Sequence, residues 1–308
     1  METTDKKLDR FLNLYWLRPE NGLLCTFKSL VCIDVEFTRP SLDVSCGDGM
    51  FMFLHLGGEL GEDFDYFRAT RAGEFSHSKF IDIYNTFERD YRPTITAQAK
   101  TRIDVGTDWK QGLLDKAGAL GLYDKLVQHD NNQVPLPLPD NYFSTVYSNS
   151  IYWVKDVEAL LAEIHRVMKP GGRAVLEVKT PYLLDTLDRL GKHLSPEAVS
   201  ILDRNRRATM PGSRTYRQWR DVMDGAGFRV EDARSVYPNR ILVDIWNVGL
   251  RPVSHLLIQM ADNLKPDDRL RIKREWVEIF STLFRPLLDL PPDHALEQSP
   301  YLCFLVRK

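Results

Sequence analysis

Residues Pro40–Met50, PSLDVSCGDGM, decide the fold class of this chain. A short apolar run at 42–44 leads into a turn that contains Gly47 and Gly49, and an apolar block follows directly at 50–56. This order predicts a strand, a tight glycine turn and a helix. Glycine lets the backbone approach a ligand closely, and the N–H groups of the following helix face polar atoms placed there. The stretch therefore predicts a nucleotide-type site, although a purely structural turn gives the same pattern.

The composition predicts a globular protein without a broad surface for nucleic acid. The chain has 308 residues, of which 43% are hydrophobic and 27% charged, and a net charge of −2. Such a chain buries a full core, and it lacks the strongly basic balance of a nucleic-acid-binding domain. A cluster of arginines is interpreted as solvated helix faces: Arg204, Arg206, Arg207, Arg214, Arg217 and Arg220.

The cysteines and the apolar segments predict a cytoplasmic protein. The cysteines are too far apart for the Cys-x-x-Cys spacing of a zinc or redox site: Cys25, Cys32, Cys46 and Cys303. No apolar segment follows the charged N-terminus, so no secretory signal is predicted. The longest apolar region, 241–260, is interrupted by Asp244, Arg251 and Pro252, so we predict no transmembrane segment.

Apolar periodicity predicts an alternation of strands and helices. Helices are predicted within 8–37, with a break at Pro19 to Gly22, and at 109–122, 155–168 and 215–225. Strands are predicted at 42–44, 101–108, 124–130, 143–149, 173–178, 228–236 and 301–308, with a KPGG turn at 169–172 before the fifth. We therefore predict an α/β fold with a doubly wound, mostly parallel, seven-stranded sheet. Its last strand is expected to run antiparallel, at or near an edge.

We predict a single domain over 1–308. It comprises N-terminal helices at 1–37, a core at 38–236 and 300–308, and insertions at 57–100, 182–214 and 238–299. The late insertion is apolar on almost all its faces, so we expect another surface to cover it. We expect the insertions to form a lid over the substrate, while a homodimer interface or a peripheral membrane contact are alternatives for the late one.

Two stretches resemble class I S-adenosylmethionine-dependent methyltransferases of the small-molecule, methyltransferase 11 type. The first is the glycine turn, with Asp43, Ser45, Gly47 and Gly49, in which Ser45 stands where the motif commonly has its first glycine. The second is 129–181, with an acidic residue after the third strand, a Leu-Pro segment, an aromatic-rich fourth strand and a helix ending in RVMKPGG. The likeness covers about 40–236 without 57–100. It implies a Rossmann-like sheet and S-adenosylmethionine as cofactor.

The resemblance implies roles for several residues. Asp108, at the end of the second strand, is expected to accept hydrogen bonds from both ribose hydroxyls, unless it only caps the next helix. Asp130 and Asn131 are expected at the adenine edge, with a plain turn as the alternative. Trp109 is expected on the adenine face or in the core. The other residues predicted to bind the cofactor are Asp43, Ser45, Cys46, Gly47, Gly49 and Ser148.

The predicted function is methyl transfer to a small-molecule acceptor, an oxygen nucleophile of a sugar-derived or natural-product intermediate. Asn149, Tyr152 and Trp153 follow the fourth strand and are expected to line the acceptor pocket, with His255 reaching over it from the late insertion. No catalytic base is assigned and no metal site is predicted. The alternative is a non-catalytic protein of the same fold that binds or scaffolds. An NAD-dependent enzyme is disfavoured, because the glycine spacing does not suit a pyrophosphate.

Overall fold

The fold is built around a seven-stranded sheet. The computed structural model describes residues 4–69 and 92–308. The strand order is β5-β4-β1-β6-β7-β9-β8. The strands are β1 (Ser41–Val44), β4 (Ile103–Asp108), β5 (Tyr123–Gln128), β6 (Phe143–Ser148), β7 (Met168–Lys179), β8 (Arg229–Ser235) and β9 (Tyr301–Arg307). Pairing is parallel from β5 to β7, whereas β9 runs antiparallel to β7 and to β8. The predicted mostly parallel α/β sheet, with its last strand near an edge, is confirmed.

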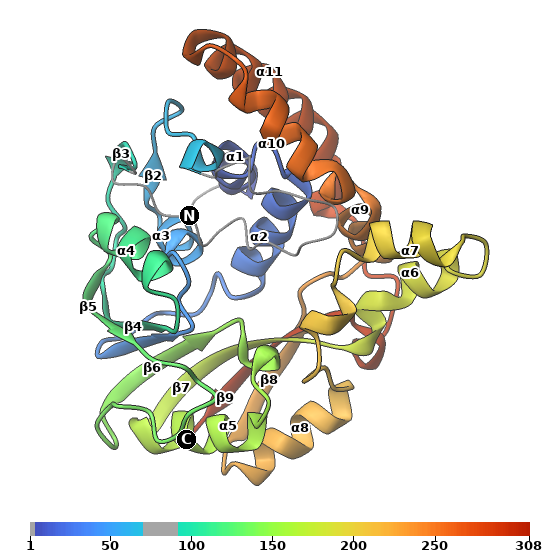
Figure 1. Cartoon of the computed structure of the whole chain (residues 1–308). Helices are drawn as coiled ribbons and strands as arrows, with labels where there is room; N and C mark the ends of the chain where they lie inside the picture. Colours follow the sequence, from blue (N-terminus) through green and yellow to red (C-terminus); the bar gives the residue numbers. More distant parts are fainter. Residues whose placement is uncertain (1–3, 70–91) are drawn as a thin grey trace.

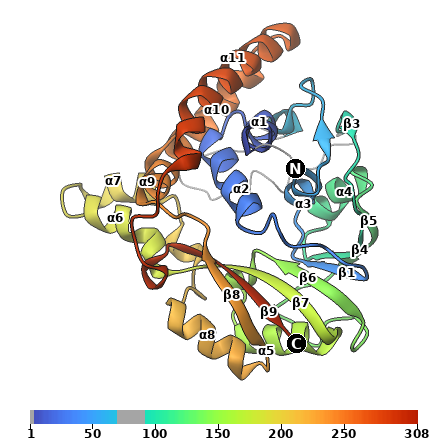
Figure 2. The ribbon, with the colours of Figure 1, turned by 180° about the vertical axis from the view of Figure 1, so that it is seen from behind.

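Helices cover both faces of this sheet, as Figures 1 and 2 show. One face carries α3 (Met50–His55) and α4 (Gln111–Ala119), and the other carries α5 (Val157–Val167) and α8 (Tyr216–Gly225). The apolar residues of α5 recur at three- and four-residue intervals and are all buried: Val157, Leu160, Leu161, Ile164 and Val167. α8 begins with a capping box in which Thr215 and Gln218 satisfy each other's backbone N–H groups. Both helices thus start and pack as their sequences predict.

Further helices precede the sheet and lie between its last strands. The N-terminal pair is α1 (Thr4–Leu14) and α2 (Pro19–Val31). Those inserted between β7 and β9 are η4 (Pro181–Leu184), α6 (Asp185–Leu190), α7 (Pro196–Asp203), η5 (Arg207–Thr209), α9 (Arg240–Val248), η6 (Arg251–Val253), α10 (Ser254–Asp262), α11 (Pro266–Phe284), η7 (Arg285–Asp289) and η8 (Leu296–Gln298). α9 packs against α2, and α11 packs against α1 (Figure 1). The N-terminal helices therefore pack against the late insertion.

The segment 57–100 packs at the glycine turn where the structure describes it. It contains η1 (Tyr66–Ala69) and an antiparallel pair, β2 (Glu59–Leu60) and β3 (Ile95–Ala97), while 70–91 lie outside the described residues. The Tyr66 hydroxyl donates a 2.5 Å hydrogen bond to the Asp48 carboxylate.

The KPGG segment lies inside β7, whereas the sequence predicted a turn before that strand. Gly171 has φ +75°, and the pairing of β6 with β7 shifts register between Phe143 and Thr145. Glycine adopts this positive φ without the steric cost of a Cβ, so the strand contains an irregularity here and continues.

One helical stretch of the described chain, Arg240–Asp262, is long and apolar enough to cross a membrane. The structure divides it into α9, η6 and α10, and 39% of its apolar window is buried inside the protein. A single stretch of this kind is weak evidence for a span, because core helices of soluble proteins pass the same test.

Candidate cofactor and acceptor site

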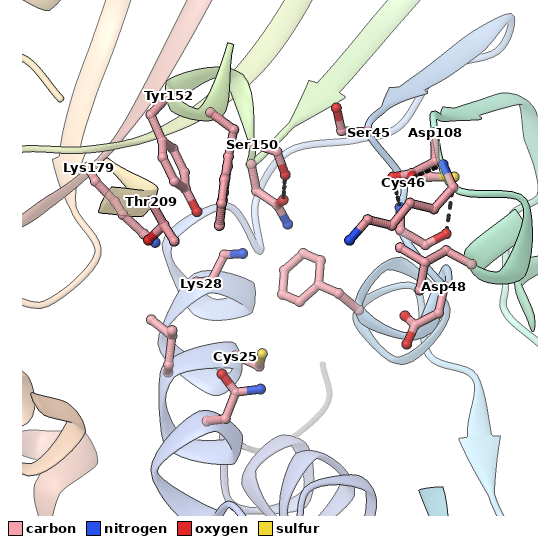
Figure 3. Close-up of a pocket in the computed structure, with 18 of the residues that line it drawn as sticks. Cys25, Lys28, Ser45, Cys46, Asp48, Asp108, Ser150, Tyr152, Lys179 and Thr209 are labelled. Carbon is pink, nitrogen blue, oxygen red and sulfur yellow. Dashed lines mark hydrogen bonds between the residues drawn. The ribbon is translucent and has the colours of Figure 1, made fainter. Parts of the chain in front are cut away.

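A cavity of about 700 Å³ lies between the glycine turn, α2 and the inserted helices. Figure 3 shows the two ends of this cavity on opposite sides of the view. On one side lie Ser45, Cys46, Asp48 and Asp108, and on the other lie Tyr152, Lys179 and Thr209. Lys28 of α2 projects between them. We call the first side the glycine-turn end.

The two glycines of the turn serve different needs. Gly47 lines the cavity at φ +60°, and a Cβ built on it would meet nothing within 4 Å. Gly49 has φ +72°, and a Cβ there would stand 2.8 Å from the Tyr123 ring. Gly47 therefore leaves open space at the cavity wall, whereas Gly49 permits helix α3 to pack closely on the sheet.

Ser45 takes a backbone conformation that suits glycine. Its φ is +61°, and its hydroxyl accepts a 2.7 Å hydrogen bond from the Asn131 side-chain amide. The Oδ1 atom of Asn131 is buried and has no hydrogen-bond partner among the described residues. Because Asn131 lines the cavity, this oxygen is an acceptor available to a ligand.

Asp108 is held by backbone groups at the cavity wall. Its Oδ2 accepts a 3.1 Å hydrogen bond from the Gly47 N–H, and its Oδ1 accepts one of 2.9 Å from the Lys110 N–H. Burial raises the pKa of this carboxyl above its ordinary value. The N-cap residue of α4 is Lys110, so Asp108 is not that helix's cap. Each carboxylate oxygen retains a lone pair with which to accept a further hydrogen bond.

Asp130 and Trp109 complete the glycine-turn end. The Asp130 Oδ1 accepts hydrogen bonds of 2.9 Å from the backbone and the side chain of Asn132, which lower its pKa. This is the turn that the sequence also allowed, and Asp130 nevertheless lines the cavity. Trp109 is 60% exposed at the mouth, so it is not a core tryptophan. Its ring is accessible to a flat ligand. Cys46 also lines the cavity, and burial raises the pKa of its thiol.

The residues after β6 line the cavity as expected from the sequence. Asn149 accepts a 2.8 Å hydrogen bond from the Ser150 hydroxyl and donates one of 3.2 Å to the Tyr147 hydroxyl. Tyr152 and Trp153 lie in the short helix η3 (Ile151–Trp153) and face the same space.

Four predicted site residues do not line the cavity. Asp43 is buried within β1, where it accepts a 2.7 Å hydrogen bond from the Tyr123 hydroxyl. Ser148 is fully buried and donates to the Val44 carbonyl. Gly49 packs against Tyr123, as described above. His255 lies behind the wall, with its Nδ1 2.9 Å from Nη1 of Arg204. The first two sit inside strands, so their side chains meet neighbouring core atoms before they reach the edge.

The sequence does not predict several of the residues that line the cavity. They come from α2, from the end of β7 and from the inserted segments: Arg18, Lys28, Asp48, Lys179, Arg204, Arg206, Trp246, Arg251 and Tyr301. Arg206 is 1% exposed, and both Arg204 and Arg206 line the cavity, which corrects the interpretation of these two residues as part of a solvated face. Within 4–69 and 92–308, no cluster of His, Cys, Asp or Glu could hold a metal ion.

A family model described as a methyltransferase domain matches residues 94–176. This range runs from just before β3 into β7 and includes Asp108, Trp109, Asp130 and Asn131. Residues 94–176 therefore belong to a methyltransferase domain. S-adenosylmethionine is the cofactor that such a domain uses.

Two curated relatives of the methyltransferase domain are 33% identical to this chain over short stretches. A ubiquinone/menaquinone biosynthesis C-methyltransferase, UbiE, from Psychromonas ingrahamii matches over 94 residues, which cover 26% of this chain and 38% of the relative. A demethylmenaquinone methyltransferase from Symbiobacterium thermophilum matches over 87 residues, 25% of this chain and 34% of the relative. The chain thus spans little more than a third of these relatives. A solved S-adenosylmethionine-dependent methyltransferase from Mesorhizobium loti is 16% identical, with TM-score 0.45, covering 92% of this chain and 98% of that one.

The glycine-turn end of the cavity fits S-adenosylmethionine chemically. A ribose diol needs two hydrogen-bond acceptors, and the adenine amine needs a third. The Asp108 carboxylate supplies a pair, and the unpartnered Oδ1 of Asn131 supplies another. The open space beside Gly47 leaves room for a ligand against the backbone.

Proposed function

We propose that this chain transfers the methyl group of S-adenosylmethionine to a small-molecule acceptor. The observation that supports this most is that one cavity joins two ends of different chemistry. Its glycine-turn end carries Asp108 and Asn131, and the same space continues to Asn149 and Tyr152. Its volume of about 700 Å³ lies within the usual range of small-molecule sites, roughly 300 to 1,000 Å³.

The roles of the residues follow from their chemistry. Asp108 binds the ribose hydroxyls, Asn131 with Asp130 meets the adenine edge, and Trp109 covers the adenine face. Ser45, Cys46 and Gly47 bring backbone groups to the rest of the cofactor. When bound, S-adenosylmethionine supplies a methyl group made electrophilic by its positively charged sulfur. Asn149, Tyr152 and Trp153 position the acceptor, and such positioning makes the encounter effectively unimolecular.

We further propose that the acceptor atom is an oxygen. Hydroxyl and amide groups of Asn149 and Ser150 line this part of the cavity and suit a hydroxyl-bearing ligand. One relative is named for C-methyl transfer, and the matched stretch covers only about a quarter of this chain. A carbon acceptor is therefore the second candidate for the same cavity.

The test uses the purified chain, cofactor labelled with ¹³C in its methyl group, and cell extract. We expect S-adenosylhomocysteine to accumulate by mass spectrometry, and the label to appear at an O-methyl chemical shift. A label at a C-methyl shift would leave the enzyme assignment intact and replace oxygen by carbon. Cofactor binding without S-adenosylhomocysteine would favour the non-catalytic, scaffolding alternative and contradict methyl transfer.

A further inference from the structure

The end of the cavity opposite the glycine turn concentrates positive charge. Arg18, Arg204, Arg206 and Arg251 line it, together with Lys179 at the end of β7. These side chains come from three parts of the chain: the start of α2, the α7–η5–η6 region and β7. We call them the arginine end. Two carboxylates of the described chain lie at this end. Glu20 pairs with Arg18 at 3.1 Å and lies near Arg251, and Asp203 lies near Arg206 and Arg251.

Backbone carbonyls fix the positions of Arg204 and Arg251. Arg251 donates to the carbonyls of Asp203 and Arg204, at 2.8 and 3.3 Å. Arg204 donates in return to the carbonyls of Arg251 and Pro252, both at 3.2 Å. These reciprocal hydrogen bonds join two chain segments that are 47 residues apart in sequence. Carbonyl partners hold a guanidinium in place, whereas a carboxylate would also cancel its charge.

Arg206 has hydrogen-bond donors to spare. It is 1% exposed, its guanidinium lies 4.1 Å from the Trp246 ring centroid, and its Nη1 donates to Asn247. Its Nε and Nη2 are buried and have no partner among the described residues. Lys179 Nζ lies close by, 5.8 Å from the same Trp246 ring. Unsatisfied charged donors in a buried site are costly unless a ligand completes them.

Burial and neighbouring positive charges together lower the pKa values of three of these side chains. Burial, followed by the charges of Arg251 and Arg18, lowers the pKa of Arg206 well below its usual range. Burial and the neighbouring Arg18 and Arg204 lower the pKa of Arg251 to about 9. Burial, then Arg206, Lys28 and Arg251, lowers the pKa of Lys179. A negative charge bound among these groups would raise all three pKa values, because it favours the protonated forms.

We propose that the acceptor carries an anionic oxyacid group, a carboxylate or a phosphate, which binds at the arginine end. Arg206 supplies the unpartnered donors, and Arg204, Arg251 and Lys179 supply further positive charge. Planar guanidinium donors match the oxygens of either group. Aromatic side chains also line the cavity, namely Phe51, Tyr152 and Tyr301, and they suit an apolar body in the same ligand. This inference rests on the proposed function, since it names the class of acceptor.

The experiment measures anion binding directly, on the full chain, in buffer free of phosphate and carboxylates. Isothermal titration calorimetry is run with benzoate, with phenyl phosphate and with uncharged benzamide. We expect at least one of the two anions to bind at least tenfold more tightly than benzamide, and the preferred anion to show which oxyacid the site suits. Arg206→Met should weaken that anion at least tenfold, and Arg206→Lys by less. The matched control is Arg217→Met, which replaces an exposed arginine of α8 outside the cavity and should change nothing.

A second variant guards against misfolding. Lys179→Met replaces the buried lysine by an uncharged, unbranched side chain of similar length, and it should weaken binding of the same anion at least threefold. Equal binding of the anions and benzamide, or equal anion binding by both variants and the Arg217→Met control, would overturn the inference. S-adenosylhomocysteine binding, measured separately, separates the two proposals. If the chain binds the anion through Arg206 but does not bind S-adenosylhomocysteine, only the proposed function is contradicted. If it binds S-adenosylhomocysteine but not the anion, only this inference is contradicted.

Discussion

The Asn131 side-chain amide donates a 2.7 Å hydrogen bond to the hydroxyl of Ser45, whose φ is +61°. This bond joins the glycine turn after β1 to the loop after β5. A side chain at positive φ costs roughly 1–2 kcal/mol, which explains why glycine is common at this position of the motif. Here the hydrogen bond offsets part of that cost. It also orients Asn131 so that its Oδ1 remains available to a ligand.

Substitutions at Ser45 should therefore separate backbone strain from the hydrogen bond. Ser45→Gly removes both, and we expect the free energy of unfolding to change by less than about 1 kcal/mol. Ser45→Val places a β-branched side chain at φ +61°, and we expect a loss of about 2 kcal/mol or more. Urea denaturation followed by circular dichroism measures both values. A Ser45→Val chain as stable as Ser45→Gly would contradict the left-handed conformation.

The two glycines of the turn should respond differently to alanine. Gly49→Ala adds a Cβ 2.8 Å from the Tyr123 ring at positive φ, and we expect it to cost about 2–4 kcal/mol of stability. Gly47→Ala meets no atom within 4 Å, so it should cost only the strain of about 1 kcal/mol. Its methyl group stands at the cavity wall, so S-adenosylhomocysteine affinity should fall severalfold. If Gly47→Ala is the more destabilising of the two, the division of roles is wrong.

Asp43 should make stability depend on pH. Burial raises its pKa to about 7, above the value of about 3.9 in an unfolded chain. The folded state therefore binds this proton more tightly, and the contribution of Asp43 to stability falls as pH rises from about 4 to about 7. Asp43→Asn removes the titration and retains an acceptor for Tyr123. Between pH 5 and pH 8, we expect the wild-type chain to lose about 1–3 kcal/mol relative to Asp43→Asn. Parallel stability profiles for the two chains would contradict this.

The fold and the glycine-turn end could be predicted from the sequence because their signals are local. Strand, turn and helix follow one another within Pro40–Met50, and Asp108 directly ends an apolar strand. The position of the Asp43 side chain could not be predicted, because the pattern indicates the strand but not the neighbouring residue that the side chain contacts. The Asp43 carboxylate accepts a buried hydrogen bond from the hydroxyl of Tyr123, which is 80 residues away in sequence.

The arginine end could not be predicted because its residues are brought together only by the tertiary fold. Arg206 follows α7, and Arg251 begins η6, on the far side of strand β8 in sequence. In the sequence, a run of arginines is typical of a solvated surface. Burial of Arg206 depends on Trp246 and Asn247 of α9, which no local pattern near Arg206 indicates.

The central claim is that the glycine-turn end binds S-adenosylmethionine through Asp108. Isothermal titration calorimetry with S-adenosylhomocysteine tests it most directly, with Asp115→Ala, an exposed carboxylate of α4 outside the cavity, as the matched control. We predict that the wild-type and Asp115→Ala chains bind within twofold of each other, and that Asp108→Ala binds at least tenfold more weakly. An Asp108→Ala chain that folds and binds with unchanged affinity would contradict the account.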